Sequence, residues 1–388
     1  MKKIIVLTLS LVLLLSGCAP NFNKQEEVVQ NKEDSKAKAI IPNYKISDKY
    51  YHTILHDKPG EPSYKPGETR GLVVQNINTR IDINEFETGL MRVAQNTFST
   101  DKYMFQEGQF LKRDVVKLWL NPKFTKEEVE ARGLKEEQNI GLNPLDNASD
   151  GKKEYLAHIL EHNYYAKNDD GNYKLAGAVI GLALNSVYYY KDENDIMRET
   201  KIKHAELEKE GKQIAEEVLR RVRNIADLKD IPITIALFEQ ESKTSVVPGN
   251  FFAYANAGKE SSKLGNWEKV DEKYYQFPSS AANEAHRDDS NSFLNFKQDV
   301  ETYFPNFNGV IGRALYAQGQ LQELNINIPI QFYGKAEGIG FVQYVTGLLV
   351  QHFPDYISIQ VSITSVNGPE ALIVRKADQK EPFVHIYQ

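Results

Sequence analysis

The fold class is inferred outward from the sequence GAVIGLALNSVYYY, residues 177–190. This stretch holds no charged residue and ends in three consecutive tyrosines. We predict a strand here, since apolar and aromatic side chains pack well on a pleated, half-buried surface. Tyr188, Tyr189 and Tyr190 also suggest a platform for a carbohydrate or a peptide. We favour the packing interpretation, because aromatic residues commonly end strands for that reason.

The elements that follow this strand form a pattern that occurs twice. A long amphipathic helix at 204–224 comes next, and strands follow at 231–238 and 251–257. The second copy has a strand, a helix and two strands in the same order, at 321–333, 336–352, 356–363 and 371–375. We therefore predict an α+β fold with mixed sheets, amphipathic helices and a duplicated β-α-β-β unit. Residue identity between the copies is slight, so the duplication rests on element order.

Periodicity and capping signals predict further helices. Apolar residues recur at helical spacing behind Asp82, and Thr125 and Glu128 have the spacing of a capping box. Residues 133–151 and 259–289 are polar or rich in turn formers, so we expect mostly loop there. The other predicted helices lie at 112–120, 125–132, 153–165 and 291–304.

The length of the chain suits more than one domain. Removing a leader from 388 residues leaves about 370, which is enough for two or three compact domains. The stretch after the leader is polar and mixed in charge, and turn formers follow it, so it predicts a flexible tether. We expect a signal peptide at 1–17, the tether at 18–67, a first α+β domain at 68–283 and a second at 284–388.

The composition is that of a globular chain and excludes several kinds of site. Hydrophobic residues make up 41% and charged residues 26% of the chain. Forty-seven basic and 53 acidic residues give a net charge of −6, and no segment is dense in Lys and Arg, so we do not expect nucleic acid as a partner. The single cysteine, Cys18, excludes an intrachain disulfide and a zinc site of paired cysteines. We expect no cofactor.

The start of the chain has the outline of a secretory leader. Two lysines follow Met1, and residues 4–17 carry no charge. Such a run rises only about 21 Å as a helix, short of the roughly 30 Å hydrocarbon core, so a permanent transmembrane span is the weaker interpretation. The last four residues of the leader region, Leu15-Ser16-Gly17-Cys18, resemble the bacterial lipobox.

The lipobox resemblance implies that diacylglycerol is attached to the sulfur of Cys18 and that lipoprotein signal peptidase cuts between Gly17 and Cys18. We therefore expect a protein of the cell membrane, lipid-anchored on the extracellular face. The alternative is a plain secretory leader whose cysteine happens to lie near the cut. Nothing in the sequence indicates a further protein or peptide partner.

The pattern His158-Ile-Leu-Glu161-His162 matches the H-x-x-E-H motif of inverted zinc peptidases, with Glu239 as a candidate third ligand. In the predicted helix, His158 and His162 lie opposite the apolar arc and face solvent, where a catalytic zinc lacks a walled cavity. We therefore predict no metal site and no enzyme activity, and we keep an extracellular zinc-dependent hydrolase as the alternative function. A solute-binding protein for a transporter is a third alternative, disfavoured because two large alternating lobes are not indicated.

Several long stretches resemble one known family. From Arg70 to the C-terminus the chain resembles the CamS family, Gram-positive lipoproteins described as sex pheromone precursors. The matching stretches are DKYMFQEGQFL (101–111), NIGLNP (139–144), GLALNSVYYY (181–190), GKQIAEEVL (211–219), DLKDIPI (227–233), FYGKAEGIGFVQYVTG (332–347) and EPFVHIY (381–387).

The resemblance implies that the pheromone comes from the leader and not from the folded part. In this family a short hydrophobic peptide is released after signal peptidase cuts and a membrane protease trims the remnant. The corresponding candidate here is LVLLLSG, formed by Leu11, Val12, Leu13, Leu14, Leu15, Ser16 and Gly17. The family brings no assigned active site, so we expect an unassigned binding or adhesion role for the folded ectodomain.

Overall fold

The computed structural model describes most of the chain. Its described residues are 25–29, 36–41, 46–58, 61–144, 153–169, 171–192, 194–303 and 309–388. The predicted signal peptide and Cys18 lie outside them. Residues ahead of 68 take part in the fold, because the side chains of Tyr51 and Ile54 are buried. The short strands of this part are β1 (Gln25–Val29), β2 (Lys36–Ile40), β3 (His52–Thr53), β4 (Leu55–Lys58) and β5 (Glu61–Ser63).

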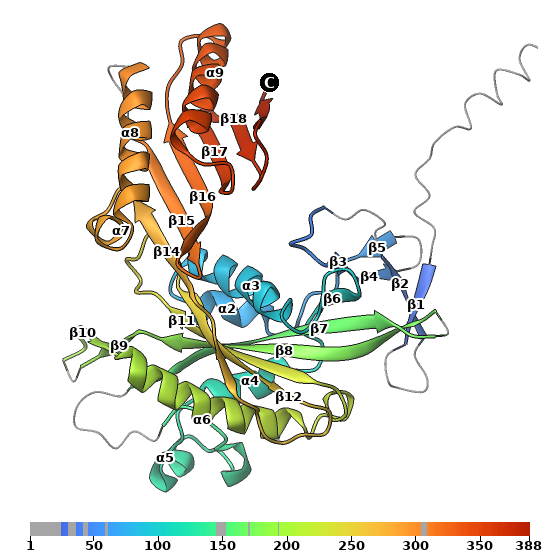
Figure 1. The fold of residues 1–388 in the computed structure, drawn as a ribbon. Helices are drawn as coiled ribbons and strands as arrows, with labels where there is room; N and C mark the ends of the chain where they lie inside the picture. Colours follow the sequence, from blue (N-terminus) through green and yellow to red (C-terminus); the bar gives the residue numbers. More distant parts are fainter. Residues whose placement is uncertain are drawn as a thin grey trace, which may run out of the picture.

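Strand β8 (Tyr173–Asn185) lies at the centre of the first sheet (Figure 1). Strand β7 (Leu156–Lys167) pairs with it antiparallel, and β11 (Ile233–Gln240) pairs with it parallel on the other side. The sheet continues through β12 (Asn250–Ala257) to β13 (Trp267–Lys269). The predicted strands at 231–238 and 251–257 are thus confirmed, and the one predicted at 177–190 is confirmed as far as Asn185.

One further strand belongs to this sheet, and a separate hairpin lies next to it in the sequence. Strand β6 (Tyr103–Glu107) pairs antiparallel with the second half of β7, beginning at His162. The tyrosine-rich end of the predicted strand forms a separate element, β9 (Val187–Lys191), which makes a two-stranded hairpin with β10 (Met197–Lys201).

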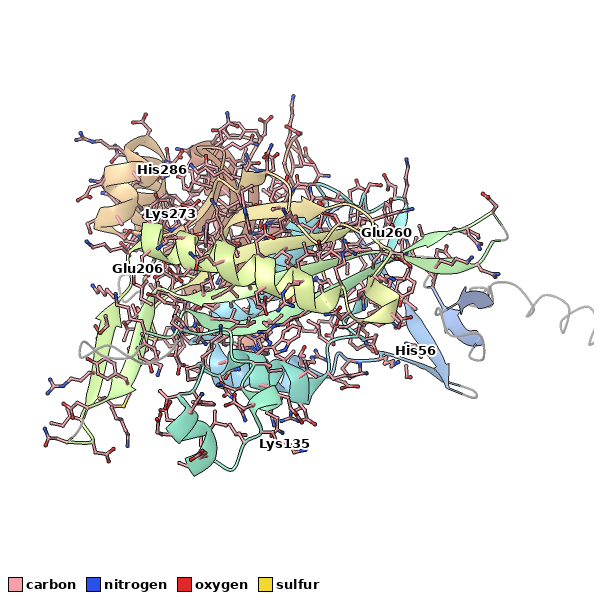
Figure 2. The ribbon with its side chains drawn as sticks, turned by 90° about the horizontal axis from the view of Figure 1, so that it is seen from below. His56, Lys135, Glu206, Glu260, Lys273 and His286 are labelled. Carbon is pink, nitrogen blue, oxygen red and sulfur yellow. The ribbon has the colours of Figure 1, made fainter. Side chains whose placement is uncertain are left out.

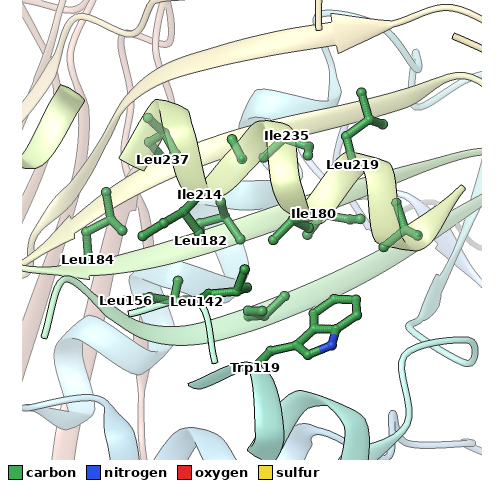
Figure 3. Close-up of a cluster of buried hydrophobic side chains, with 14 of the residues drawn as sticks. Trp119, Leu142, Leu156, Ile180, Leu182, Leu184, Ile214, Leu219, Ile235 and Leu237 are labelled. Atoms are coloured by element: carbon green, nitrogen blue, oxygen red, sulfur yellow. The ribbon is translucent and has the colours of Figure 1, made fainter. Parts of the chain in front are cut away.

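Helices cover both faces of the first sheet. On one face lies α6 (His204–Val222), which Figure 2 shows lying along the sheet with Glu206 near its start. Its apolar side packs with Ile180, Leu182 and Leu184 of β8 (Figure 3). The same face holds α4 (Arg113–Leu120), α5 (Lys126–Ala131), and the short 3-10 helices Glu136–Gln138 and Ala226–Leu228. The opposite face is covered by α2 (Arg70–Asn76) and α3 (Arg80–Ala94).

The predicted helix at 153–165 is wrong, because this segment is strand β7. Leu156, Ile159, Leu160 and Tyr164 do fit a helical period, yet all four are buried in a strand that is covered on both faces. A strand without a solvent face does not need to alternate polar and apolar residues, so its sequence can imitate another period.

A second sheet lies against α8 (Arg287–Tyr303) and α9 (Lys335–His352), with the short α7 (Ser280–Ala285) beside them (Figure 1). Three of its strands, at 272–277, 311–317 and 383–386, fall where we predicted no strand, and the second sheet starts before residue 284. In order across the sheet, the strands are β14 (Glu272–Phe277), β15 (Ile311–Ala317), β16 (Gln320–Pro329), β17 (Ser358–Ser365), β18 (Gly368–Arg375) and β19 (Phe383–Ile386).

The predicted β-α-β-β unit occurs twice with the same topology. In each copy a strand runs into a helix, returns as a parallel neighbour and is followed by an antiparallel strand: β8-α6-β11-β12 and β16-α9-β17-β18. The correspondence extends further than predicted. The strand sequence β6-β7-β8-β11-β12-β13 has the same neighbours and directions as β14-β15-β16-β17-β18-β19.

An ion pair network joins the two units. Arg92 of α3 donates two hydrogen bonds to Glu272 at the start of β14, at 2.7 and 3.2 Å, and also pairs with Glu85. The hydroxyl of Tyr274 donates to the second oxygen of Glu85 at 2.7 Å. Burial raises the pKa of Glu85, and the Arg92 guanidinium opposes that rise. The network therefore holds a buried carboxylate between the first helix layer and the second sheet.

Among the described residues, no helix combines the length and the apolar character that crossing a membrane requires.

Substituting Gly177 by alanine tests the packing above β8. A Cβ at this position lies 2.2 Å from Cζ of Phe98, so we expect the free energy of unfolding to fall by about 1–3 kcal/mol. The control is Gly347→Ala in α9, where no atom lies within 4 Å and alanine favours the helix by about 0.5–1 kcal/mol. Urea unfolding followed by circular dichroism measures both, and equal effects contradict the close approach.

Substituting Arg92 by methionine tests the junction between the units. It removes the cation from the buried Glu85 carboxylate, so we expect a loss of about 3 kcal/mol in the free energy of unfolding. The control is Lys112→Met, which breaks an ion pair with Glu68 whose side chains are 55% and 50% exposed and which should cost less than about 1 kcal/mol. A loss at Arg92 no larger than at Lys112 contradicts the interpretation.

Candidate functional site

The structure separates the residues of the His158-x-x-Glu161-His162 pattern. His158 and His162 are buried, so the prediction that they face solvent is wrong. Their rings lie edge-on to Phe86 and Phe105 on the α3 side of the sheet, while Glu161 points to the other face because side chains alternate along a strand. Four residues along a strand span about 13 Å, which is too far for two histidines to share one metal ion.

Glu161 has a structural role in this arrangement. Its carboxylate accepts backbone N–H groups of Gln109 at 3.2 Å, Phe110 at 3.2 Å and Leu111 at 2.6 Å. Burial raises the pKa of Glu161, and these backbone hydrogen bonds oppose the rise. Both carboxylate oxygens accept backbone hydrogen bonds, so the side chain fixes the turn between β6 and α4.

The candidate third ligand, Glu239, pairs with another residue. Glu239 lies at the end of β11 and forms a 2.6 Å ion pair with Nδ1 of His204, whose side chain is 54% exposed. Within the ranges that the structure describes, no group of three His, Cys, Asp or Glu side chains is placed to hold a metal ion. The geometry gives the zinc hydrolase alternative no support.

The two histidines of β7 belong to the core. Burial lowers the pKa of His158 and of His162 to about 3. Neither ring nitrogen of His158 has a hydrogen-bond partner in the structure, so the side chain is neutral and serves as an aromatic packing residue.

A polar groove of about 670 Å³ opens on the described surface of the first unit. It lies where α2, the end of α4, the start of β7 and the β9 hairpin meet. Its lining includes amide side chains and two tyrosines, and we call it the amide groove. These residues are Asn76, Asn78, Asn121, Asn185, Tyr188 and Tyr189. Leu72, Lys117, Leu156 and Lys243 also line it.

Hydrogen bonds to buried amides fix the walls of the amide groove. Asn143 is fully buried, and its side chain both accepts from the N–H of Leu156 at 2.7 Å and donates to the carbonyl of Leu156 at 3.0 Å. Gln240 accepts from the N–H of Asn78 at 2.8 Å and donates to Asn185 at 2.6 Å. These contacts join the segment after α2 to β11 and β8, and they join Asn143 to the start of β7, so several walls of the groove are fixed by hydrogen bonds within the protein.

Sequence reasoning missed this site. Its residues come from segments far apart in the chain and have no motif spacing. The one available signal was the run of tyrosines, which we interpreted as strand packing. In the structure Tyr188 does stack on Tyr190, with ring centroids 5.8 Å apart, yet Tyr188 and Tyr189 also line the groove.

The other predicted site residues cannot be placed. Leu11, Gly17 and Cys18, with the leader residues between them, lie outside the described residues. Lipidation, signal cleavage and peptide release therefore stay predictions.

Comparison with known proteins gives a consistent result over the folded part. A family model described as CamS sex pheromone cAM373 precursor matches residues 64–381. The C-terminal domain of the sex pheromone staph-cAM373 precursor from Staphylococcus aureus is 36% identical with a TM-score of 0.70, and the match covers 81% of this chain and 98% of that one. A sex pheromone precursor from Lactobacillus salivarius subsp. salivarius UCC118 is 30% identical with a TM-score of 0.79, covering 89% and 98%. A search of curated proteins found no match.

His158→Leu tests whether this histidine is a core residue. Because the pKa of His158 is lowered to about 3 from 6.5, its contribution to stability is present above pH 6.5 and is lost as the pH falls toward 3. Leucine does not titrate, so we expect the variant to gain about 2 kcal/mol relative to the unchanged protein between pH 7 and pH 5. Urea unfolding at both pH values measures this gain.

The control for this experiment is His385→Leu on the edge strand β19, where the ring is exposed in the folded as in the unfolded chain. A pH-dependent gain of the same size at both positions contradicts the core assignment of His158.

Proposed function

The chain belongs to the CamS family of sex pheromone precursors, and on that premise we propose that it is a membrane-anchored surface lipoprotein whose leader yields a short hydrophobic signalling peptide. The observation that carries the proposal is the leader itself. An uncharged run at residues 4–17 follows two lysines and ends in Leu15-Ser16-Gly17-Cys18. The family match begins at residue 64 and does not extend to this segment, so the anchor and the peptide rest on the leader sequence.

The chemistry of the lipobox supports the anchor. A thiol is the nucleophile needed to take a lipid, and Cys18 is the single cysteine of the chain. Small residues at Ser16 and Gly17 let a peptidase approach the backbone. Diacylglycerol on Cys18 would hold the folded part at the extracellular face of the membrane through the segment ahead of the first sheet.

The composition of the leader supports the peptide. The segment from Leu11 to Gly17 holds five aliphatic residues and no charge, so it partitions into membranes once it is released. Such a peptide needs a binding protein or an importer at its destination. The folded part has a separate role in binding or adhesion, which the preformed amide groove supports.

Cys18→Ala tests the order of these steps. Without the thiol no lipid is attached, the signal peptidase lacks its substrate, and we expect both a diacylated terminus and free LVLLLSG to vanish. Mass spectrometry on the membrane fraction and the culture medium measures the two products. The control is Ala19→Ser, which changes the neighbouring residue and leaves the lipobox intact, so both products should persist. A free peptide from the Cys18→Ala chain, or no lipidated terminus in the unchanged protein, contradicts the proposal.

A further inference from the structure

We propose that the amide groove binds an oligosaccharide of acetamido sugars. The proposal names a ligand class for the binding role suggested above for the folded part. It does not depend on release of the leader peptide, so the two proposals fail separately.

The groove has the size and the rigidity of a binding site. Its volume of about 670 Å³ lies within the range of roughly 300–1,000 Å³ that small-molecule sites occupy. Its walls are fixed by Asn143 and Gln240, whose side chains join separate strands and helices. A preformed site loses little conformational entropy when a ligand binds.

The lining offers free amides. The side chains of Gln75, Asn76 and Asn121 line the groove and form no hydrogen bond with the part of the chain that the structure describes. An amide presents one acceptor and two donors, which is the set that pairs with hydroxyl groups and with another amide. Sugars that carry acetamido groups present both.

The tyrosines offer the apolar complement. Tyr188 and Tyr189 both line the groove, and an aromatic side chain combines a flat apolar surface with a polar tip. The hydroxyl of Tyr189 accepts from the N–H of Lys243 at 3.1 Å, and the Lys243 ammonium lies 4.3 Å from the centroid of its ring. These contacts hold the ring in place. A sugar ring has the matching character, with C–H groups on its faces and hydroxyls at its rim.

An extended peptide is the less suitable occupant. A peptide that adds to a sheet needs unpaired backbone groups on a strand edge. At the groove the start of β7 is buried at Leu156, and the side chain of Asn143 already pairs with both the N–H and the carbonyl of that residue. Lys117 and Lys243 leave the groove mildly basic beside Glu154, so an uncharged or acidic glycan meets no repulsion.

The test uses the full chain extracted in a detergent without a sugar headgroup, with hexa-N-acetylchitohexaose as the probe and cellohexaose as the matched hexamer without acetamido groups. Saturation-transfer NMR and calorimetric titration should show saturable binding of the first and at least tenfold weaker binding of the second. Tyr189→Ala and Gln75→Ala should each weaken binding by about tenfold, since a lost contact of 1.4 kcal/mol changes affinity tenfold.

Two variants separate binding from folding. Tyr333→Ala, at a tyrosine that is 98% exposed in the second unit, should bind as the unchanged protein does. Tyr189→Phe keeps the ring and should retain most of the affinity. Gln75 is exposed and has no partner to lose, so its variant stays folded. Equal binding of cellohexaose, binding insensitive to Tyr189 and Gln75, or binding of an extended alanine-rich peptide without binding of the glycan overturns the proposal.

Discussion

Strand β8 is packed on both faces, and the first unit is organised around this constraint. Helix α6 covers one face and α3 the other, while β7 and β11 take up the backbone hydrogen bonds at its edges. Gly177 and Gly181 lie where the rings of Phe98 and Phe86 approach the backbone, so at these two positions the rings sit closer than a side chain on β8 would allow. Polar groups buried in the first unit have no access to water. Asn143 and Glu161 are therefore bound to backbone groups of neighbouring segments.

This double burial explains which parts of the fold could be predicted. The helices α3, α5 and α6 carry local information, such as the Thr125–Glu128 capping box that the structure contains. Strand β7 carries no such local signal. Its neighbours on both faces are distant in sequence, and a strand buried on both faces can have its apolar residues at any spacing. Strands β14 and β15 are short and half-polar, and they exist because they complete a sheet with β16. Their partners determine them more than their own residues do.

The candidate site, too, depends on residues that are distant in sequence. Two histidines and a glutamate at the spacing of a helical metal motif become, on a strand, residues of opposite faces that share no ion. The amide groove depends on Asn143, which lies in a loop and pairs with β7 only after the chain has folded. A motif search finds residues that are close in sequence. A groove made by α2, α4, β7 and β9 is visible only once those elements are placed in space.

The helix pair α2–α3 also explains why the two copies of the repeat differ. The first copy is preceded by this pair, which buries the second face of its sheet. Among the described residues the second copy has no such helix pair of its own, and the sheet face opposite α8 and α9 carries polar residues such as Asn325 and Gln360. Part of that polar face lies over α3. Asn84 and Thr88 of α3 line a pocket there together with Glu323 and Asn325. Arg92 of the same helix pairs with Glu272. One helix layer thus completes the core of the first copy, supplies Asn76 to the amide groove and anchors the second copy. A partly polar sheet face in the second copy follows from this arrangement, because its contact with the first unit is made through ion pairs and not through a shared apolar core.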